Sequence, residues 1–178
     1  MKTPAANNIL ITGAPGVGKT TLIKHLSQIV SSRRQAGFFT EEIREDGVRK
    51  GFMLVSLDGK RRTLAHTEIN NRYRVGKYGV DIEGFERFLE NIDLINPTAE
   101  LLIIDEIGKM ECMSGRFKYL LQAALDSPIP LVATIALKGG GIFEQIKERS
   151  DSVLLEITRT NRESLISKII PILDLREQ

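Results

Sequence analysis

The chain has 178 residues, a net charge of +2 and one cysteine. This length predicts one domain, spanning residues 1–178, with enough apolar side chains to bury a core. The small net charge does not by itself indicate a nucleic acid or a membrane as a partner. Cys112 alone cannot form an internal disulfide, and with only two histidines present a Cys/His metal site is not expected.

The N-terminal residues and the hydropathy of the chain predict its cellular location. Residues 1–6 contain no apolar core of the kind a signal peptide requires, and no segment has the length of a membrane-spanning helix. We therefore expect a cytoplasmic protein with no membrane partner. We also expect a monomer.

The most informative stretch lies near the N-terminus. Residues 8–12 form a short apolar run that predicts a buried strand, and residues 20–30 carry apolar side chains at helical spacing. Between them, residues 13–20 read GAPGVGKT and fit the pattern G-x-x-x-x-G-K-[ST] at every fixed position. A strand, a glycine loop and a helix in this order place phosphate groups at a helix N-terminus. The sequence therefore predicts a nucleotide-binding loop.

Each residue type in this loop has a chemical reason to be there. The glycines let the backbone turn sharply and bring its N–H groups close to phosphate oxygens. Lys19 is expected to reach the β- and γ-phosphates, and the Thr20 hydroxyl to ligate Mg²⁺. The predicted phosphate-binding residues are Gly13, Ala14, Pro15, Gly16, Val17, Gly18, Lys19 and Thr20.

The middle of the chain predicts an antiparallel meander. Asp46-Gly47 and Asp58-Gly59 are turn signals between three strand-like segments, residues 37–44, 51–57 and 61–66. This excursion interrupts the βαβ rhythm, so we place it at one edge of the sheet. Residues 67–79 are polar, and we interpret them as a loop and a candidate lid over the nucleotide.

The second half alternates apolar strands with amphipathic helices. Helices are expected from about residue 83 to the Asn96-Pro97 break, and over residues 114–125, 142–149 and 160–173. Strands are expected over residues 101–105, 131–137 and 153–157. This alternation predicts a three-layer α/β sandwich with a largely parallel sheet, whose ligands bind outside the carboxyl ends of the strands.

Two acids at the end of the strand over residues 101–105 are the expected partners of the loop. Asp105 ends a continuously apolar run, and a carboxylate there can hold Mg²⁺ together with Thr20. Glu106 follows directly and is the candidate general base that polarises the attacking water. Residues 105–108 also fit the GTPase pattern D-x-x-G, but the chain has no [NT]-K-x-D segment, so guanine specificity is not predicted.

Several charged residues are candidates for stabilising the transition state, because an arginine supplied in cis can neutralise charge during phosphoryl transfer. Considered one at a time, each is more simply explained as an ordinary surface charge. They are Arg44, Arg74, Lys109, Glu111, Arg116 and Arg162. The cluster Lys60-Arg61-Arg62 lacks interleaved aromatic residues, so it is weak support for nucleic-acid binding.

Five runs together resemble a known family, the thermophile-type nucleoside-triphosphatases. They are residues 13–20, the run GFxTEExR at 37–44, RVGxYxVD at 74–81, IIDEIGKME at 103–111 and Asn161-Arg162. The resemblance covers nearly the whole chain. It implies a RecA-like branch of the P-loop fold and Mg²⁺-dependent hydrolysis of nucleoside triphosphates with little preference among ATP, GTP, CTP and UTP.

The resemblance also implies site residues. Lys19 and Glu106 are the implied catalytic residues, and Thr20 and Asp105 the implied metal ligands. A second nucleotide-binding segment is implied at Ile103, Ile104, Asp105, Glu106, Ile107, Gly108, Lys109 and Met110. The chain departs from the family pattern at Cys112-Met113, where relatives commonly carry an apolar pair with Phe.

Three functions fit the sequence. The leading one is a nucleoside-triphosphatase. The second is a nucleotide or small-molecule kinase of the same class, which would need a phosphoryl acceptor. The third is a nucleotide-gated nucleic-acid-binding module that uses the basic residues at 60–62 and 72–77, and its affinity would fall steeply with salt.

Overall fold

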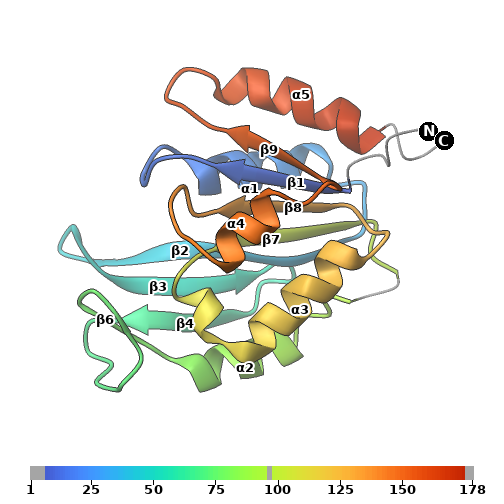
Figure 1. Cartoon of the computed structure of the whole chain (residues 1–178). Coiled ribbons are helices and arrows are strands. Elements are labelled where there is room, and N and C mark those ends of the chain that lie inside the picture. Colours follow the sequence, from blue (N-terminus) through green and yellow to red (C-terminus); the bar gives the residue numbers. More distant parts are fainter. Residues whose placement is uncertain (1–6, 96–97, 175–178) are drawn as a thin grey trace.

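The computed structural model describes residues 7–95 and 98–174. A single mixed sheet forms its middle layer (Figure 1), with strands in the order β5-β6-β4-β3-β2-β7-β8-β1-β9. The strands are β1 Asn8–Thr12, β2 Gln35–Glu45, β3 Val48–Ser56, β4 Arg61–His66, β5 Arg74–Val75, β6 Tyr78–Val80, β7 Leu101–Ile107, β8 Leu131–Ile135 and β9 Ser152–Glu156. The helices are α1 Lys19–Ile29, α2 Ile82–Glu90, the 3₁₀ turn η1 Glu111–Met113, α3 Gly115–Asp126, α4 Ile142–Lys147 and α5 Arg162–Asp174.

The parallel half of the sheet consists of β2, β7, β8, β1 and β9. Strand β8 lies between β1, which leads into the glycine loop, and β7, which ends in the predicted acids. The side chain of Thr12 at the end of β1 donates to the carbonyl of Ile135 at the end of β8, 3.1 Å away. The carboxyl ends of these strands therefore meet at one edge, as predicted.

Helices cover both faces of the sheet (Figure 1) because each has one apolar stripe. On one face, α1 and α5 pack through Leu22, Leu26 and Ile169. On the other face, α2, α3 and α4 pack around Phe38, whose ring makes edge contacts with those of Phe85, Phe88 and Phe117. This is the predicted three-layer α/β sandwich.

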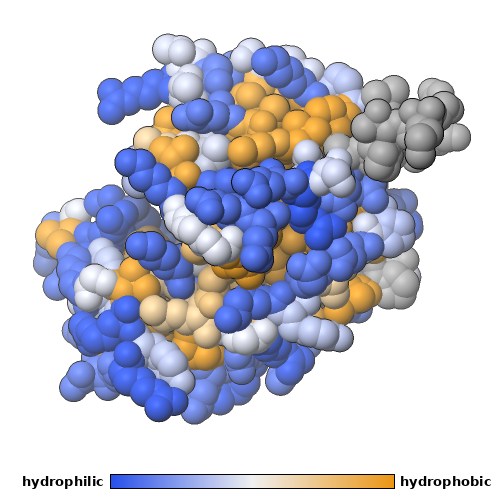
Figure 2. All heavy atoms as spheres, in the orientation of Figure 1, coloured by the Kyte–Doolittle hydropathy of each residue, from blue (hydrophilic) through white to orange (hydrophobic). Residues whose placement is uncertain are grey.

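The antiparallel meander also lies where it was predicted, outside β2. Strands β2 and β3 pair antiparallel around the Asp46-Gly47 turn, and β4 pairs antiparallel with β3. At the opposite edge of the sheet is β9, where Leu154 is 43% exposed. Apolar side chains gather between β9 and α5 on the face shown in Figure 2.

Two expectations about the middle of the chain were wrong. Residues 67–79 are not simply a loop, because β5 and β6 form a hairpin with Val75 opposite Tyr78, and β6 extends the meander by pairing with β4. Helix α2 ends at Glu90, well before the expected break, because the Asn91 side chain bonds the carbonyl of Arg87 at the helix end. Asn96 and Pro97 themselves lie outside the described residues.

Candidate nucleotide site

The glycine loop connects β1 to α1 and forms the floor of the site. Gly16 and Gly18 have positive φ angles of 74° and 105°, which L side chains rarely adopt, so glycine is required for this turn. Gly18 is the N-cap of α1 and offers no side chain there, which leaves the helix N-terminus open to an anion. The Lys19 ammonium lies across the loop and donates to the carbonyls of Gly13 and Ala14 at 2.9 and 3.2 Å.

Asp105 lies near the carboxyl end of β7 and is held by neighbours on three other elements. It is 1% exposed. Its carboxylate accepts a hydrogen bond of 2.7 Å from the Thr134 hydroxyl on β8 and one of 3.3 Å from the Thr40 amide on β2. The Thr20 hydroxyl, in the first turn of α1, lies close enough to this carboxylate to lower its pKa. Burial raises the pKa of Asp105, while these hydrogen bonds act in the opposite direction.

This donor set fits Mg²⁺. A buried carboxylate that has no ion-pair partner among the described residues lies near a hydroxyl at the start of α1, and both groups are hard oxygen ligands. Within residues 7–95 and 98–174, no cluster of three or more His, Cys, Asp or Glu side chains could enclose a metal by itself. An ion held by Thr20 and Asp105 would therefore need phosphate oxygens and water to complete its shell, which is typical of Mg²⁺.

Glu106 is less buried than Asp105 and lines the cavity above the loop. Burial is the main reason that the pKa of Glu106 is raised, and the nearby Asp105 carboxylate adds to the effect, while Lys19 opposes it. A carboxylate whose pKa moves from its ordinary value towards neutrality is a better proton acceptor at neutral pH. Both the position and the basicity of Glu106 suit a general base.

A second buried acid, Glu111 in η1, lies close to Glu106. It is 3% exposed and begins the 3₁₀ turn η1. A Cβ added to Gly108 would lie 2.7 Å from Glu111 Oε2 and 3.0 Å from Glu106 Oε1, so the two carboxyl groups converge on one side of Gly108. Burial and the carboxylate of Glu106 raise the pKa of Glu111 well above its ordinary range, which favours the protonated form of this group.

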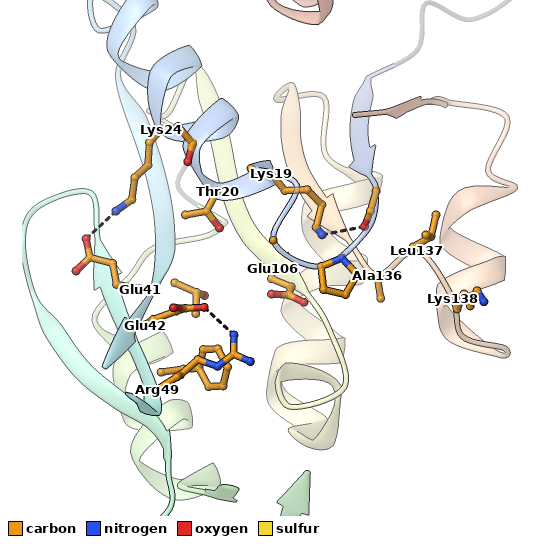
Figure 3. A pocket seen from close by; sticks show the side chains of 17 residues that line it. Lys19, Thr20, Lys24, Glu41, Glu42, Arg49, Glu106, Ala136, Leu137 and Lys138 are labelled. Atoms are coloured by element: carbon orange, nitrogen blue, oxygen red, sulfur yellow. Dashed lines mark hydrogen bonds and ion pairs between the residues drawn. The ribbon is translucent and has the colours of Figure 1, made fainter. Parts of the chain in front are cut away.

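The cavity over the loop has a volume of about 1100 Å³. One wall is the phosphate loop with Lys19 and Thr20, and the opposite wall is the β2–β3 hairpin (Figure 3). In this view Glu106 lies between Lys19 and Arg49. A smaller cavity of about 260 Å³ adjoins it and shares Thr40, Phe52, Glu106 and Ala136 with it.

The hairpin wall contains two residues, Arg49 and Phe52, that were not identified from the sequence as part of the site. It contributes Glu41, Glu42, Arg49 and Phe52, and α1 adds Lys24. Lys24 pairs with Glu41 at 2.6 Å, and Arg49 pairs with Glu42 at 2.7 Å. Ala136, Leu137 and Lys138 line the cavity from the segment after β8. The Asp46-Gly47 turn predicts that Arg44 and Arg49 lie opposite each other, but the sequence alone cannot say that this hairpin folds back over the loop.

The other predicted residues of the β7 segment divide into two groups. Ile103, Ile104 and Ile107 are fully buried in the two cores and line neither cavity. Lys109 and Met110 line the smaller cavity, together with Val75 from the expected lid. Nucleotide contacts by these residues stay predictions.

The remaining candidate cations do not line the main cavity, although Arg162 lies directly behind its phosphate loop. Arg116 pairs with Glu90 on α2 at 3.3 Å, and Arg74 donates to the carbonyls of Ile69 and Lys77. Arg162, at the start of α5, packs its guanidinium against Gly18 from outside the cavity lining. In the basic cluster, every member is paired, Lys60 with Asp58, Arg61 with Glu41 and Arg62 with Asp81.

A strand, a GxxxxGKT loop and a helix, with a buried acid on the strand beyond the neighbouring one, define a P-loop NTPase of the α/β class. Comparisons with known proteins identify the family. A family profile described as NTPase matches residues 8–170, and the chain belongs to this family.

The chain is similar to proteins of this family from bacteria and from mammals. It is 45% identical to the nucleoside-triphosphatase THEP1 of Thermotoga sp. strain RQ2, over 93% of this chain and 94% of that protein. It is 36% identical to the human cancer-related nucleoside-triphosphatase, over 93% and 95% of the two chains.

Solved structures agree with the fold. The crystal structure of THEP1 from Aquifex aeolicus superposes with a TM-score of 0.84 at 33% identity, covering 94% of this chain and 99% of that one. The solution structure of the human cancer-related nucleoside triphosphatase gives 0.79 at 34% identity, covering 97% and 100%.

Proposed function

We propose that the protein hydrolyses nucleoside 5′-triphosphates to the diphosphate and phosphate, with Mg²⁺ and with broad tolerance of the base. The observation that carries this is the convergence of Lys19, Thr20 and Glu106 on one cavity, with Asp105 directly behind Thr20. The names of the relatives support hydrolysis rather than transfer to an acceptor.

Each of these residues would have a distinct role in hydrolysis. The loop amides and Lys19 bind the β- and γ-phosphates, the ammonium exchanging its loop carbonyls for phosphate oxygens. Thr20 and Asp105 would hold Mg²⁺, which neutralises developing charge on the phosphates when bound. Glu106 orients a water and takes its proton, while the bond from the γ-phosphorus to the bridging oxygen breaks and a bond to the water oxygen forms.

The test is phosphate release measured beside nucleotide binding. Glu106→Gln keeps the size of the side chain and loses its basicity, so kcat should fall on the order of a hundredfold or more while triphosphate affinity changes little. Lys19→Ala should lose binding as well, because it removes the charge that grips the phosphates. Glu83→Gln is the matched control, since that carboxylate is 86% exposed on α2 and lines neither cavity. An unchanged single-turnover rate in Glu106→Gln would refute the role of Glu106.

Base tolerance has its own measurement. The chain lacks a guanine-reading segment, and a site that grips mainly phosphates discriminates little among bases. We expect kcat/KM for ATP, GTP, CTP and UTP to lie within about tenfold of one another, well inside the range that polar recognition can produce. Activity on one base with the others more than about a thousandfold lower would contradict this.

The cellular location and the oligomeric state complete the proposal. Among the described residues, none of the helices has the length and apolarity needed to cross a bilayer. The cytoplasmic location and the monomeric state stay predictions from the sequence.

A further inference from the structure

The cavity contains one guanidinium whose role is not yet explained. Its cationic side chains, within the part of the chain that the structure describes, are Lys19, Lys24, Arg49 and Lys138. Lys19 belongs to the phosphate loop, and Lys24 is bonded to Glu41 at 2.6 Å. Lys138 lies on the segment after β8, and in Figure 3 it points away from the loop. Arg49 is the arginine among the described residues that line the cavity, and it lies on the wall opposite the loop.

The contacts of Arg49 hold its guanidinium in one orientation. Nη1 donates to Glu42 Oε1 at 2.7 Å, and Nε donates to the Tyr78 hydroxyl at 3.2 Å. The guanidinium carbon also lies 5.4 Å from the centre of the Phe52 ring. Nη2 has no hydrogen-bond partner among residues 7–95 and 98–174. Because two of its nitrogens are held and the third is free, the planar fork presents ready donors to an anion in the cavity.

The surroundings of Arg49 connect it to the general base. Its stacking partner Phe52 lines both cavities, as does Glu106. Arg49 thus lies on the Glu106 side of the cavity, where the γ-phosphoryl group and the attacking water would meet. Its side chain is 45% exposed, so it can reach a ligand without a rearrangement of the core.

We propose that Arg49 contacts the γ-phosphoryl group and stabilises its charge in the transition state. This rests on the proposed triphosphatase function. The reaction stays as written above: the bond to the bridging oxygen breaks, the bond to water forms and Glu106 receives the proton. Arg49 keeps its own proton throughout and supplies charge and hydrogen bonds, the role of an arginine provided in cis.

The chain offers a matched control in Arg44. Both arginines pair with Glu42, Arg44 at 2.6 Å and Arg49 at 2.7 Å, but Arg44 does not line the cavity and instead bonds the carbonyl of Gly47. Loss of either arginine removes one ion pair from the same carboxylate. Only loss of Arg49 removes a cation from the cavity.

The experiment compares Arg49→Ala with Arg44→Ala in the full chain, using ATP and Mg²⁺. For Arg49→Ala we expect kcat to fall on the order of a hundredfold or more, because an arginine of this kind contributes about a thousandfold or more where it has been measured. KM should stay within about threefold, since the contact forms chiefly in the transition state. Arg44→Ala should stay within about threefold of wild type in both parameters, the scale of exposed ion pairs. A kcat for Arg49→Ala within threefold of that for Arg44→Ala would overturn the proposal.

A binding measurement separates a transition-state role from a structural one. ADP with Mg²⁺ and aluminium fluoride mimics the transferring phosphoryl group, so wild type should bind this combination more tightly than ADP alone. Arg49→Ala should lose that added affinity and keep its affinity for ADP. If kcat falls but the added affinity remains, the proposal is wrong. Should Arg49→Ala fail to fold, Arg49→Gln serves with the same criteria. Failure of the triphosphatase function itself would appear separately, as no difference between wild type and Lys19→Ala in phosphate release.

Discussion

The junction between the two halves of the sheet makes a quantitative test of the fold. Strand β2 pairs parallel with β7, and Gly37 lies directly opposite Ile103. Gly37 has a φ of 135°, and an added Cβ would overlap the carbonyl oxygen of Ile103 and lie 2.7 Å from its carbonyl carbon. Carbon atoms prefer a separation of about 3.5–4.0 Å, so Gly37→Ala must push the strands apart by roughly 1 Å.

Two costs add up in Gly37→Ala. A non-glycine residue in a sparsely populated backbone conformation costs about 1–3 kcal/mol, and overpacking a buried site costs about 1–3 kcal/mol more. We therefore expect a loss of about 2–6 kcal/mol in the free energy of unfolding, a large part of the 5–15 kcal/mol typical of a domain. Thr40, which bonds Asp105, lies three residues further along β2, so activity should fall together with stability.

Urea unfolding followed by circular dichroism measures this, with Gly59→Ala as the matched control. Gly59 also has a positive φ, 88°, but an added Cβ there has no neighbour within 4 Å. Gly59→Ala should therefore show the backbone term alone, about 1–2 kcal/mol. The difference between the two variants isolates the clash with β7. If Gly37→Ala is no less stable than Gly59→Ala, the reasoning about this junction is refuted.

Three further predictions concern the titratable groups Glu111 and Cys112. Glu111→Gln should keep most activity, because burial favours the protonated carboxyl group and Gln preserves its size, while Glu111→Ala should lower kcat by leaving a cavity beside Gly108 and Glu106; equal losses would contradict this. The folded chain holds the Glu111 proton to a higher pH than the unfolded chain. Wild type should therefore lose stability relative to Glu111→Gln as pH rises above about 4.3, by up to about 1.4 kcal/mol per pH unit. Urea titrations of the two proteins in parallel measure this difference. Burial raises the pKa of Cys112 from 9.0 to about 12, so at pH 8 the native thiol should react with iodoacetamide on the order of a thousandfold more slowly than in the urea-unfolded chain. A native rate within tenfold of the unfolded one would show that the thiol is not protected.

Much of the fold and the floor of the site could be predicted from local pattern. The spacing in residues 13–20 predicts a phosphate loop because the expected chemistry is local: glycines for the turn, a lysine proposed for phosphate and a threonine proposed for the metal. The apolar run ending at Asp105 identifies a buried parallel strand, and the Asp46-Gly47 turn identifies the hairpin. Each of these signals lies within a few residues, where sequence is most informative.

The strand order and the upper wall of the site depend on which segments, distant in the sequence, come together in the fold. Only the tertiary structure shows that β8 separates β1 from β7, so that Thr134 bonds Asp105. The hairpin β5–β6 was missed because its strands are too short for a periodic pattern, and they form by pairing with β4. Arg49 was also overlooked, because a single arginine in a strand gives no local sign that it belongs to a site. It becomes part of the site because the β2–β3 hairpin folds over a loop that is far away in the sequence.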